Sequence, residues 1–272
     1  MTQYTTDYIR YTWQMINGFR AEHEKSLANF RQRDLSHILN GARSLQILDL
    51  ANGRLRPQFA ILKSAGHQIY GIDFINRPTA SPTNIAYGVA RQMYRWKLQL
   101  PQSAMTDDKL LCGDVGILPF KDDSFDLITS IAAFEHFLDV SSVVKELYRV
   151  LKPGGMVWAC IHLFTAPSGG HNLSFAQLPL RTLPKGVEPW DHLRQRRLPF
   201  HVPLNEWRKA QYIAAFQHHF EILNDYCALR EGEHLLTPAI EKELGQYTRD
   251  ELTCWAYVIV ARKPADGGAS VE

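Results

Sequence analysis

Apolar and polar positions alternate along most of the chain in short blocks that predict strands and helices in turn. Apolar runs typical of buried strands occupy residues 45–50, 67–74, 109–114, 125–130 and 156–164. Blocks with apolar residues at helical spacing lie between them, at 57–66, 83–98 and 140–155. The 83–98 block places Ile85, Val89, Met93 and Trp96 on one face. This alternation predicts a parallel sheet with helices on both faces.

The two ends of the chain depart from this alternation. Residues 5–40 are polar with intermittent apolar positions, which predicts one or two amphipathic helices, and we assign 1–43 as an N-terminal helical cap. A helix at 204–218, an apolar run at 220–230, a short helix near 237–244 and a final run at 252–263 complete a domain spanning 44–262. Residues 263–272 are expected to form a loose tail.

The segment 163–203 is rich in Gly, Pro, His and Arg and interrupts the domain. An irregular insertion of this length is typical of a lid, a binding loop or a disordered stretch. We expect it on the substrate side of the domain.

Composition narrows the classes of protein that fit. A chain of 272 residues with 45% hydrophobic positions can bury a large core, which favours one elaborated domain. The net charge of +2 does not indicate the strongly basic surface that nucleic-acid binding needs, so we expect no nucleic-acid partner. Cys112, Cys160, Cys227 and Cys254 are far apart, so we expect reduced core thiols and no metal. With neither a leader nor a long apolar segment, we expect a cytoplasmic protein without a membrane span; the oligomeric state is open.

Three stretches carry candidate chemistry at strand ends. "ILDLANGRL" (47–55) has a glycine, Gly53, in the turn after the first strand, where a ligand can approach the backbone. "GIDF" ends the second strand with Asp73, 20 residues beyond Gly53, at the spacing of a ribose-binding acid. Asp114 closes the third strand and is either a ligand contact or an ordinary loop acid. Gly53 and Asp73 together favour nucleoside binding.

Together "ILDLANG", "GIDF", "CGDVGILPFKDDSFDLITSIAAFEH" and "ELYRVLKPGG" resemble class I S-adenosylmethionine-dependent methyltransferases of the type 11 group, over roughly residues 44–162. The resemblance implies a Rossmann-like, seven-stranded, mostly parallel α/β sheet with an antiparallel last strand. It implies S-adenosyl-L-methionine as cofactor. The runs at 220–230 and 252–263 would be the two closing strands.

The resemblance also implies roles for individual residues. Asp49, Ala51 and Gly53 fall on the turn beside the methionine part of the cofactor, and Asp73 on the ribose-binding acid. Asp114 falls on the acid that meets the adenine amino group, with Val115 beside the ring. Ser130 and Ile131 lie where the fourth strand ends beneath the cofactor. The family has glycine where this chain has Ala51 and Leu55, and Leu55 is expected to narrow the site or shift its backbone.

Histidines are the candidate catalytic residues. An enzyme accelerates methyl transfer mainly by orienting the acceptor toward the donor, and an alcohol acceptor would also need a general base. His136 follows the fourth strand, and His171 and His192 lie in the insertion, with His162 and His201 at its borders. We favour His171 because Gly169 and Gly170 precede it, although a structural or solvated histidine is the common alternative. Trp190, Asp191 and the nearby arginines suggest either a substrate role or a solvated face.

The sequence therefore predicts a methyltransferase acting on a small molecule or glycan precursor, most simply at oxygen. The loops "SGGHNLSF" and "PWDHLR" faintly resemble those of bacterial glycan-pathway methyltransferases. The alternatives are N- or C-methylation of a small aromatic or metabolite, or a non-catalytic cofactor-binding module.

Overall fold

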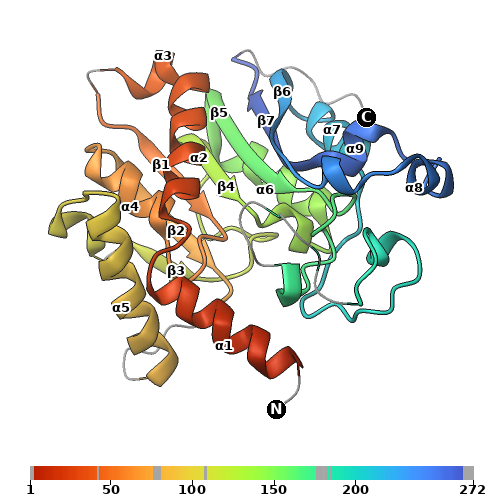
Figure 1. The fold of residues 1–272 in the computed structure, drawn as a ribbon. Coiled ribbons are helices and arrows are strands. Elements are labelled where there is room, and N and C mark those ends of the chain that lie inside the picture. Colours follow the sequence, from red (N-terminus) through yellow and green to blue (C-terminus); the bar gives the residue numbers. More distant parts are fainter. Residues whose placement is uncertain are drawn as a thin grey trace.

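A single twisted sheet forms the centre of the molecule (Figure 1). The computed structural model describes residues 3–41, 43–75, 81–106, 109–175, 180, 183 and 186–265. Within these residues the strand order is β3-β2-β1-β4-β5-β7-β6. The strands are β1 (Gln46–Leu50), β2 (Gln68–Asp73), β3 (Leu110–Cys112), β4 (Phe125–Ile131), β5 (Leu151–His162), β6 (Glu221–Arg230) and β7 (Cys254–Arg262). β1 to β5 pair in parallel, and β7 runs antiparallel to β5 and β6, which confirms the predicted fold class.

Helices cover both faces of the sheet (Figure 1). They are α1 (Gln3–Ile16), α2 (Ala21–Asp34), α3 (Ser36–Leu39), α4 (Pro57–Ser64), α5 (Pro82–Lys97), α6 (Val140–Val150), α7 (Lys209–Gln217), α8 (Pro238–Glu243) and α9 (Arg249–Thr253). Short 3₁₀ turns add η1 (Gln102–Met105), η2 (Phe134–His136), η3 (Leu173–Phe175), η4 (Asp191–Leu193) and η5 (Glu233–Leu235).

Successive residues of the central strands face opposite cores, as the period of two in a strand requires. Leu48 of β1 belongs to the core under α6 and α7, with Leu147 and Phe216. Its neighbour Ile47 belongs to the core under α2 and α4, with Leu27 and Phe59. Strands buried on both faces explain the near-continuous apolar runs of the sequence.

Three predicted boundaries are wrong. The helix predicted at 140–155 ends at Val150, because the "LKPGG" stretch is already part of β5. The helix predicted at 204–218 begins only at Lys209, after Glu206 adopts a left-handed φ of 58°. The strand predicted from 252 begins at Cys254, because Thr248 and Glu251 form a capping box that starts helix α9.

The helix α5 does not bury the face that its apolar spacing marks. Ile85, Val89 and Trp96 are more than half exposed, whereas Ala90 and Tyr94 are buried. Its side toward the molecule is thus formed by a small and an aromatic residue. Apolar periodicity predicted the position of the helix correctly. It did not predict which face of the helix packs against the rest of the protein.

Other predictions have mixed outcomes. All four cysteines are free, but Cys112 is exposed, so the expectation of a core thiol is wrong there because β3 lies at the edge of the sheet. No helix in the described ranges combines the length and apolar character that a membrane crossing needs. The predicted tail beyond residue 265, and residues 176–179, 181–182 and 184–185 of the predicted insertion, lie outside the described residues.

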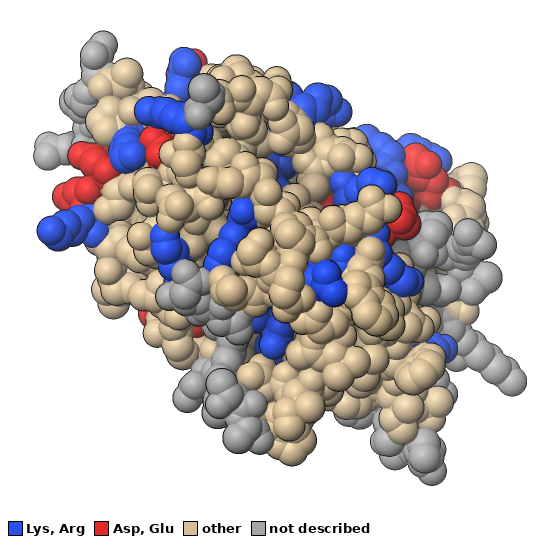
Figure 2. Space-filling model, turned by 90° about the vertical axis from the view of Figure 1, so that its left-hand side faces the viewer, with Lys and Arg blue, Asp and Glu red and all other residues tan. Residues whose placement is uncertain are grey.

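Figure 2 shows the face of the molecule that lies on the left of Figure 1, where α4 and α5 are found. Lys and Arg side chains are spread over it in small separate groups, with uncharged surface between them. Among the described residues of this face, the Lys and Arg side chains do not join into one continuous stripe.

Candidate active site

A large cavity opens at the carboxyl ends of the central strands, the edge where open α/β sheets bind ligands. Its volume is about 780 Å³. It is lined from the ends of β1, β2 and β3, from the turn after β4 and from the start of α6, and its lining residues include Ala51, Asp73, Asp114, Val115, Ala132 and His136. We call this space the cofactor cleft.

Two predicted acids lie in the cofactor cleft in different environments. Asp73 is 3% exposed, and its Oδ2 accepts a hydrogen bond from the Gly53 amide at 2.7 Å, while Oδ1 accepts from the Ile75 amide at 2.9 Å. These bonds fix the carboxylate at the end of β2 and join it to the turn after β1. Asp114 is exposed and accepts from the Gly116 amide at 2.8 Å. Asp73 is therefore held rigidly, and Asp114 lies at the open rim.

A smaller cavity of about 270 Å³ surrounds the turn after β1. Asp49 lines it and is 4% exposed, and Thr129 donates a hydrogen bond to its carboxylate at 3.0 Å. Burial raises the pKa of Asp49 to about 7, although the Arg31 charge and the Thr129 hydrogen bond oppose this shift. A buried carboxylate that is this reluctant to ionise suits a ligand cation such as an amino group.

The turn itself uses left-handed backbone. Ala51 has a φ of 52° and Gly53 a φ of 63°. Glycine adopts this conformation without strain, whereas alanine does so at a cost of about 1 kcal/mol. The replacement of the family glycine by Ala51 therefore preserves the shape of the turn and stores strain in it. Leu55, the other departure, lines the smaller cavity.

Ser130 and Ile131 end β4. Ile131 lines the smaller cavity. Ser130 is buried and donates a hydrogen bond to the Leu50 carbonyl at 3.3 Å, which ties β4 to β1. It is not among the residues that line the cofactor cleft or the smaller cavity. Ser130 thus supports the strand ends from within.

A third cavity of about 390 Å³ lies beside the cofactor cleft, and we call it the acceptor cavity. Its lining comes from segments far apart in the sequence: Tyr11, Arg20, Ala132, His136, His162, Ser168, His171, Asn172, Leu173, Phe175, Val202, Glu231 and Trp255. Ala132 lines all three cavities, so they meet at this residue. Ala132 has a φ of 52°, so it is a second residue, after Ala51, with strained backbone at the centre of the site.

Three histidines surround one buried carboxylate in the acceptor cavity. Glu135 is 1% exposed, and its Oε1 lies 3.7 Å from Nδ1 of His162 and 3.9 Å from Nε2 of both His136 and His171. Burial raises the pKa of Glu135 to about 8, against the effect of the backbone amides of Glu135 and His162.

Burial acts on the histidines in the opposite direction. It lowers the pKa of His171 to about 3, with a further contribution from His136. It also lowers the pKa of His162 and of His136. The three rings are therefore neutral near pH 7. Nδ1 of His136 lies 2.8 Å from the Pro203 carbonyl, so this nitrogen carries the proton and Nε2 is left as an acceptor.

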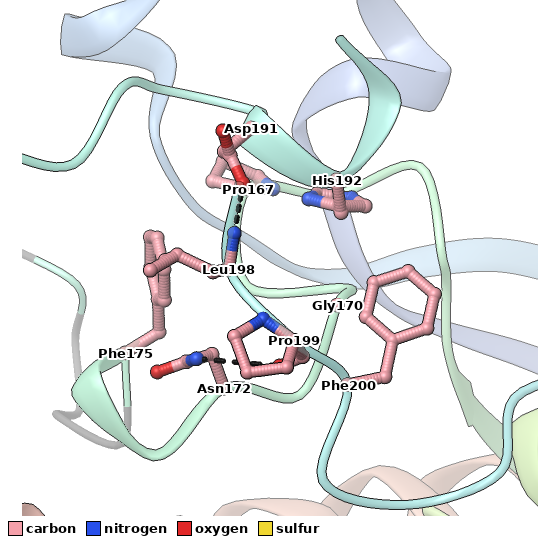
Figure 3. Close-up of a pocket in the computed structure, with 9 residues that line it drawn as sticks. All are labelled: Pro167, Gly170, Asn172, Phe175, Asp191, His192, Leu198, Pro199 and Phe200. Atoms are coloured by element: carbon pink, nitrogen blue, oxygen red, sulfur yellow. Dashed lines mark hydrogen bonds between the residues drawn. The ribbon is translucent and has the colours of Figure 1, made fainter. Parts of the chain in front are cut away.

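The structure does not bring His192 together with the other predicted catalytic histidines. It is 5% exposed, and Nε2 bonds to the Phe164 carbonyl at 2.7 Å. In Figure 3 its ring lies in a small cavity together with Gly170 and Phe200. This cavity adjoins the acceptor cavity at Asn172 and Phe175 but does not include the other histidines. Burial lowers the pKa of His192 to about 4. These contacts are those of a packed structural residue.

The neighbours of His192 in the sequence have structural contacts too. Trp190 is fully buried, and its Nε1 donates to the carbonyls of Thr165 and Leu252. Arg194 pairs with Glu243 at 2.6 Å, and Arg196 pairs with Glu206. For Arg194 and Arg196, a role in surface ion pairs fits better than a role in binding the substrate.

Sequence reasoning missed several residues of the acceptor cavity. Arg20 follows α1, Ser168 follows β5, Glu231 follows β6, and Trp255 lies in β7. None belongs to a motif, because each reaches the cavity only through the tertiary fold. The sequence could have indicated only Glu231 and Trp255, because these two residues lie at the ends of the two closing strands.

Comparison with known proteins identifies a domain family for part of the chain. Residues 48–159 match the model of a methyltransferase domain family. This part of the chain is a methyltransferase domain. Its fold and its motifs place it in the class I, type 11 group, whose methyl donor is S-adenosylmethionine.

The methyltransferase domain also has named relatives. Demethylmenaquinone methyltransferase of Lactococcus lactis is 30% identical over 157 residues, which are 54% of this chain and 56% of the relative. Sterol methyltransferase-like 3 of Botryococcus braunii is 30% identical over 152 residues, 53% of this chain and 35% of that protein. The chain thus spans about half or less of the length of these curated relatives.

The methyltransferase domain has counterparts among solved structures. A candidate sarcosine dimethylglycine methyltransferase from Galdieria sulphuraria has a TM-score of 0.53 at 16% identity, covering 90% of this chain and 86% of that one. This similarity supports the fold alone.

The residues present fit the donor that the family implies. The cofactor cleft and the smaller cavity meet at Ala51 and Ala132, one with acids at the strand ends and the other with the buried Asp49 carboxylate. Asp49 is suited to hold an ammonium group, and Asp73 is suited to hold ribose hydroxyls. When bound, the donor would supply an electrophilic methyl group on a sulfonium sulfur.

Proposed function

We propose that this protein transfers a methyl group from S-adenosylmethionine to an oxygen of a polar small molecule or glycan precursor. The observation that carries the proposal is the junction of the three cavities at Ala132. A donor in the first two cavities and an acceptor in the third would approach each other there. Orientation of this kind supplies most of the rate gain in a simple displacement.

The acceptor cavity has a polar lining that suits hydroxyl groups. Glu231 is 7% exposed and accepts a hydrogen bond from the Ser168 amide at 2.8 Å, which leaves carboxylate lone pairs for a ligand. Arg20 contributes a positive charge on the same cavity. Phe175 adds apolar surface to the same lining, and Trp255, which stacks against His162, adds part of its ring. A purely apolar acceptor would leave these polar groups unpaired, at a cost.

Two of the predicted catalytic histidines are placed to contact the acceptor. His136 lines both the cofactor cleft and the acceptor cavity, and its Nε2 is free to accept a hydrogen bond from an acceptor hydroxyl. His171 lines the acceptor cavity, with its ring 4.8 Å from that of His136. We propose that these two residues orient the hydroxyl oxygen, and we assign His192 to packing.

A transfer assay with a prior binding measurement tests the proposal. Calorimetry should first detect S-adenosylmethionine and its demethylated product. The protein is then incubated with label in the donor methyl group and with pools of sugars, nucleotide sugars and hydroxylated metabolites, and methylated products are identified by mass spectrometry. Transfer to a hydroxyl oxygen is the expected result. Absence of donor binding would contradict the enzyme assignment, and transfer to nitrogen or carbon alone would contradict O-methylation.

One observation favours a second candidate, C-methylation of a flat ring. The relatives named above methylate menaquinone precursors or belong with sterol methyltransferases by name. In this chain the His162 ring stacks on Trp255 with centroids 4.6 Å apart, which forms an aromatic wall. Testing naphthoquinol acceptors in the same assay distinguishes C-methylation of a flat ring from O-methylation of a polar acceptor. The Glu231→Gln variant is the control. That change should weaken turnover of a polar acceptor and leave a quinol acceptor unaffected.

A further inference from the structure

Glu135, His162 and His171 form a cluster in which only His171 has a role in the proposed methyl transfer. One nitrogen from each histidine and one carboxylate oxygen all lie within 4.8 Å of one another. Glu135 comes from η2, His162 from the last residue of β5 and His171 from the loop that follows β5. The three residues are thus brought together by the fold, at the wall of the acceptor cavity.

The spacing inside this cluster is too long for direct hydrogen bonds. Oε1 of Glu135 is 3.7 Å from Nδ1 of His162 and 3.9 Å from Nε2 of His171, whereas an N–H···O bond spans about 2.7–3.2 Å. Both carboxylate oxygens of Glu135 and Nε2 of His162 are buried without a hydrogen-bond partner. The backbone amides of Glu135 and His162 only oppose the rise in the pKa of Glu135, and a buried carboxyl group without a hydrogen bond of good geometry is costly, so the arrangement calls for a missing ligand.

We infer that Glu135, His162 and His171 bind one divalent transition-metal cation. An ion with bonds of about 2.1 Å holds neighbouring ligand atoms roughly 3.4 Å apart in a tetrahedron. The separations of 3.7 and 3.9 Å from Glu135 need only a small contraction to reach that value, and the two histidine nitrogens, which lie within 4.8 Å of each other, would have to approach by up to about 1.4 Å. Two imidazoles and one carboxylate are the donors of catalytic zinc sites and of non-haem iron(II) sites. The ion is therefore of the Zn²⁺, Co²⁺ or Fe²⁺ class, not Mg²⁺ or Ca²⁺.

The backbone holds these ligands in place. Gly169 packs so closely that an added Cβ would lie 2.1 Å from the Phe164 carbonyl oxygen, and His171 follows with a left-handed φ of 48°. Such strain persists where the surrounding structure fixes it, often at a functional site.

Three protein ligands leave at least one coordination position open to the acceptor cavity. If the proposed O-methylation is correct, an acceptor hydroxyl bound there would lose its proton to solvent more readily, and its oxygen would bond to the methyl carbon as the bond from that carbon to the donor sulfur breaks, which leaves the donor as a neutral thioether. Cation binding itself requires neither donor nor acceptor, so it can be measured independently of the activity.

The test uses the full chain without a histidine tag, stripped with a chelator and dialysed. ZnCl₂ is titrated by calorimetry, and Co²⁺ is followed by its visible absorption, whose intensity reports a four- or five-coordinate site. We expect one ion per chain. Glu135→Gln and His171→Ala should each weaken binding by at least ~10- to 100-fold, as loss of even supporting partners does at metal sites. Circular dichroism confirms that the variants are folded, and Glu135→Gln is chosen because it keeps the shape of the side chain.

A matched control addresses binding at surface histidines. His218 and His219 lie side by side outside the cavity, with ring centroids 4.5 Å apart, and such a pair could take up an ion. His219→Ala should leave the intense Co²⁺ absorption and the one-ion stoichiometry unchanged. The inference is overturned if the folded wild-type chain binds neither Zn²⁺ nor Co²⁺, or if Glu135→Gln and His171→Ala bind as tightly as the wild type. A chain that binds the ion and transfers no methyl group would contradict the proposed function alone.

Discussion

The cofactor cleft and the acceptor cavity are adjacent but are built in opposite ways. The cofactor cleft and the smaller cavity beside it take their key groups from strand ends and the turns that follow them, so short motifs are enough to select Asp49, Asp73 and Asp114, which line these two cavities. The acceptor cavity gathers groups from the N-terminal helices, η2, the ends of β5 and β7 and the loop after β6. Its residues share no motif. A cofactor site set by local geometry can therefore be combined with acceptor sites that differ widely between relatives.

The two regions also differ in how they store unfavourable energy. The cofactor cleft has strained backbone at Ala51 and at Ala132, which it shares with the acceptor cavity. The acceptor cavity adds buried polar atoms without partners, chiefly on Glu135. Strain of the first kind preshapes a surface, whereas the second kind is relieved when a ligand binds. Changes in the two regions should accordingly affect different measurements.

The largest effect is expected from the acceptor cavity. His171→Ala should lower turnover by ~10²–10⁴ once an acceptor is known, because the residue acts on the reacting oxygen. The dissociation constant of the donor, measured by calorimetry, should stay near normal. His201→Ala, in the same segment but outside the lining of the acceptor cavity, serves as control with near-normal turnover. Equal turnover in both variants would remove His171 from the mechanism.

Asp73→Ala tests the cofactor cleft and should have the next largest effect. It should weaken donor binding by about 10- to 100-fold, since a charged hydrogen-bonding group contributes ~1.5–3 kcal/mol. The change also frees the amides of Gly53 and Ile75. Calorimetry compares it with Asp122→Ala, whose carboxylate forms only an exposed ion pair with Arg149. Equal donor affinity in the two variants would show that Asp73 does not hold the cofactor.

The pH dependence of stability tests the buried Asp49. Its pKa is about 7 in the folded chain, against about 3.9 unfolded, so the folded state binds more protons between these values. This group's contribution to stability is therefore present below pH 4 and is lost as the pH rises to 7. Without ligand, Asp49→Asn should be more stable than wild type by ~1–2 kcal/mol at pH 8.

The same comparison at low pH is the control for Asp49. The advantage of Asp49→Asn should largely disappear near pH 3, where the wild-type carboxyl is mostly protonated in both states. Urea unfolding at the two pH values measures it. A constant difference between wild type and variant across this range would mean that Asp49 titrates normally in the folded chain.

The smallest effect is expected at the strained turn. Ala51→Gly should raise the free energy of unfolding by ~0.5–1 kcal/mol, because glycine adopts a φ of 52° without the steric cost. Ala65, which ends α4 with a φ of −78°, is the matched control, and Ala65→Gly should not be stabilising. Thermal unfolding compares the two. Destabilisation by Ala51→Gly would show that the turn is not strained by its alanine.

The sequence by itself determined the alternation of strands and helices, the antiparallel closing strand through the family resemblance, and the placement of Asp49, Ala51, Gly53, Asp73, Asp114 and Val115. These follow from local rules, since apolar periodicity and strand-end acids act within a few residues. It misjudged the exposed face of α5, the start of α7 and the burial of Cys112, because packing partners distant in sequence decide such features.

Only the tertiary structure decided the composition of the acceptor cavity. Glu135, His162 and His171 are separated by up to 36 residues, yet they meet within 4.8 Å, while His192 lies in another cavity. No short-range pattern distinguishes His171 from His192, because both lie in the same irregular segment. The difference arises from the path of the chain after β5, where the tight approach of Gly169 to the Phe164 carbonyl leads the next residues to the buried carboxylate.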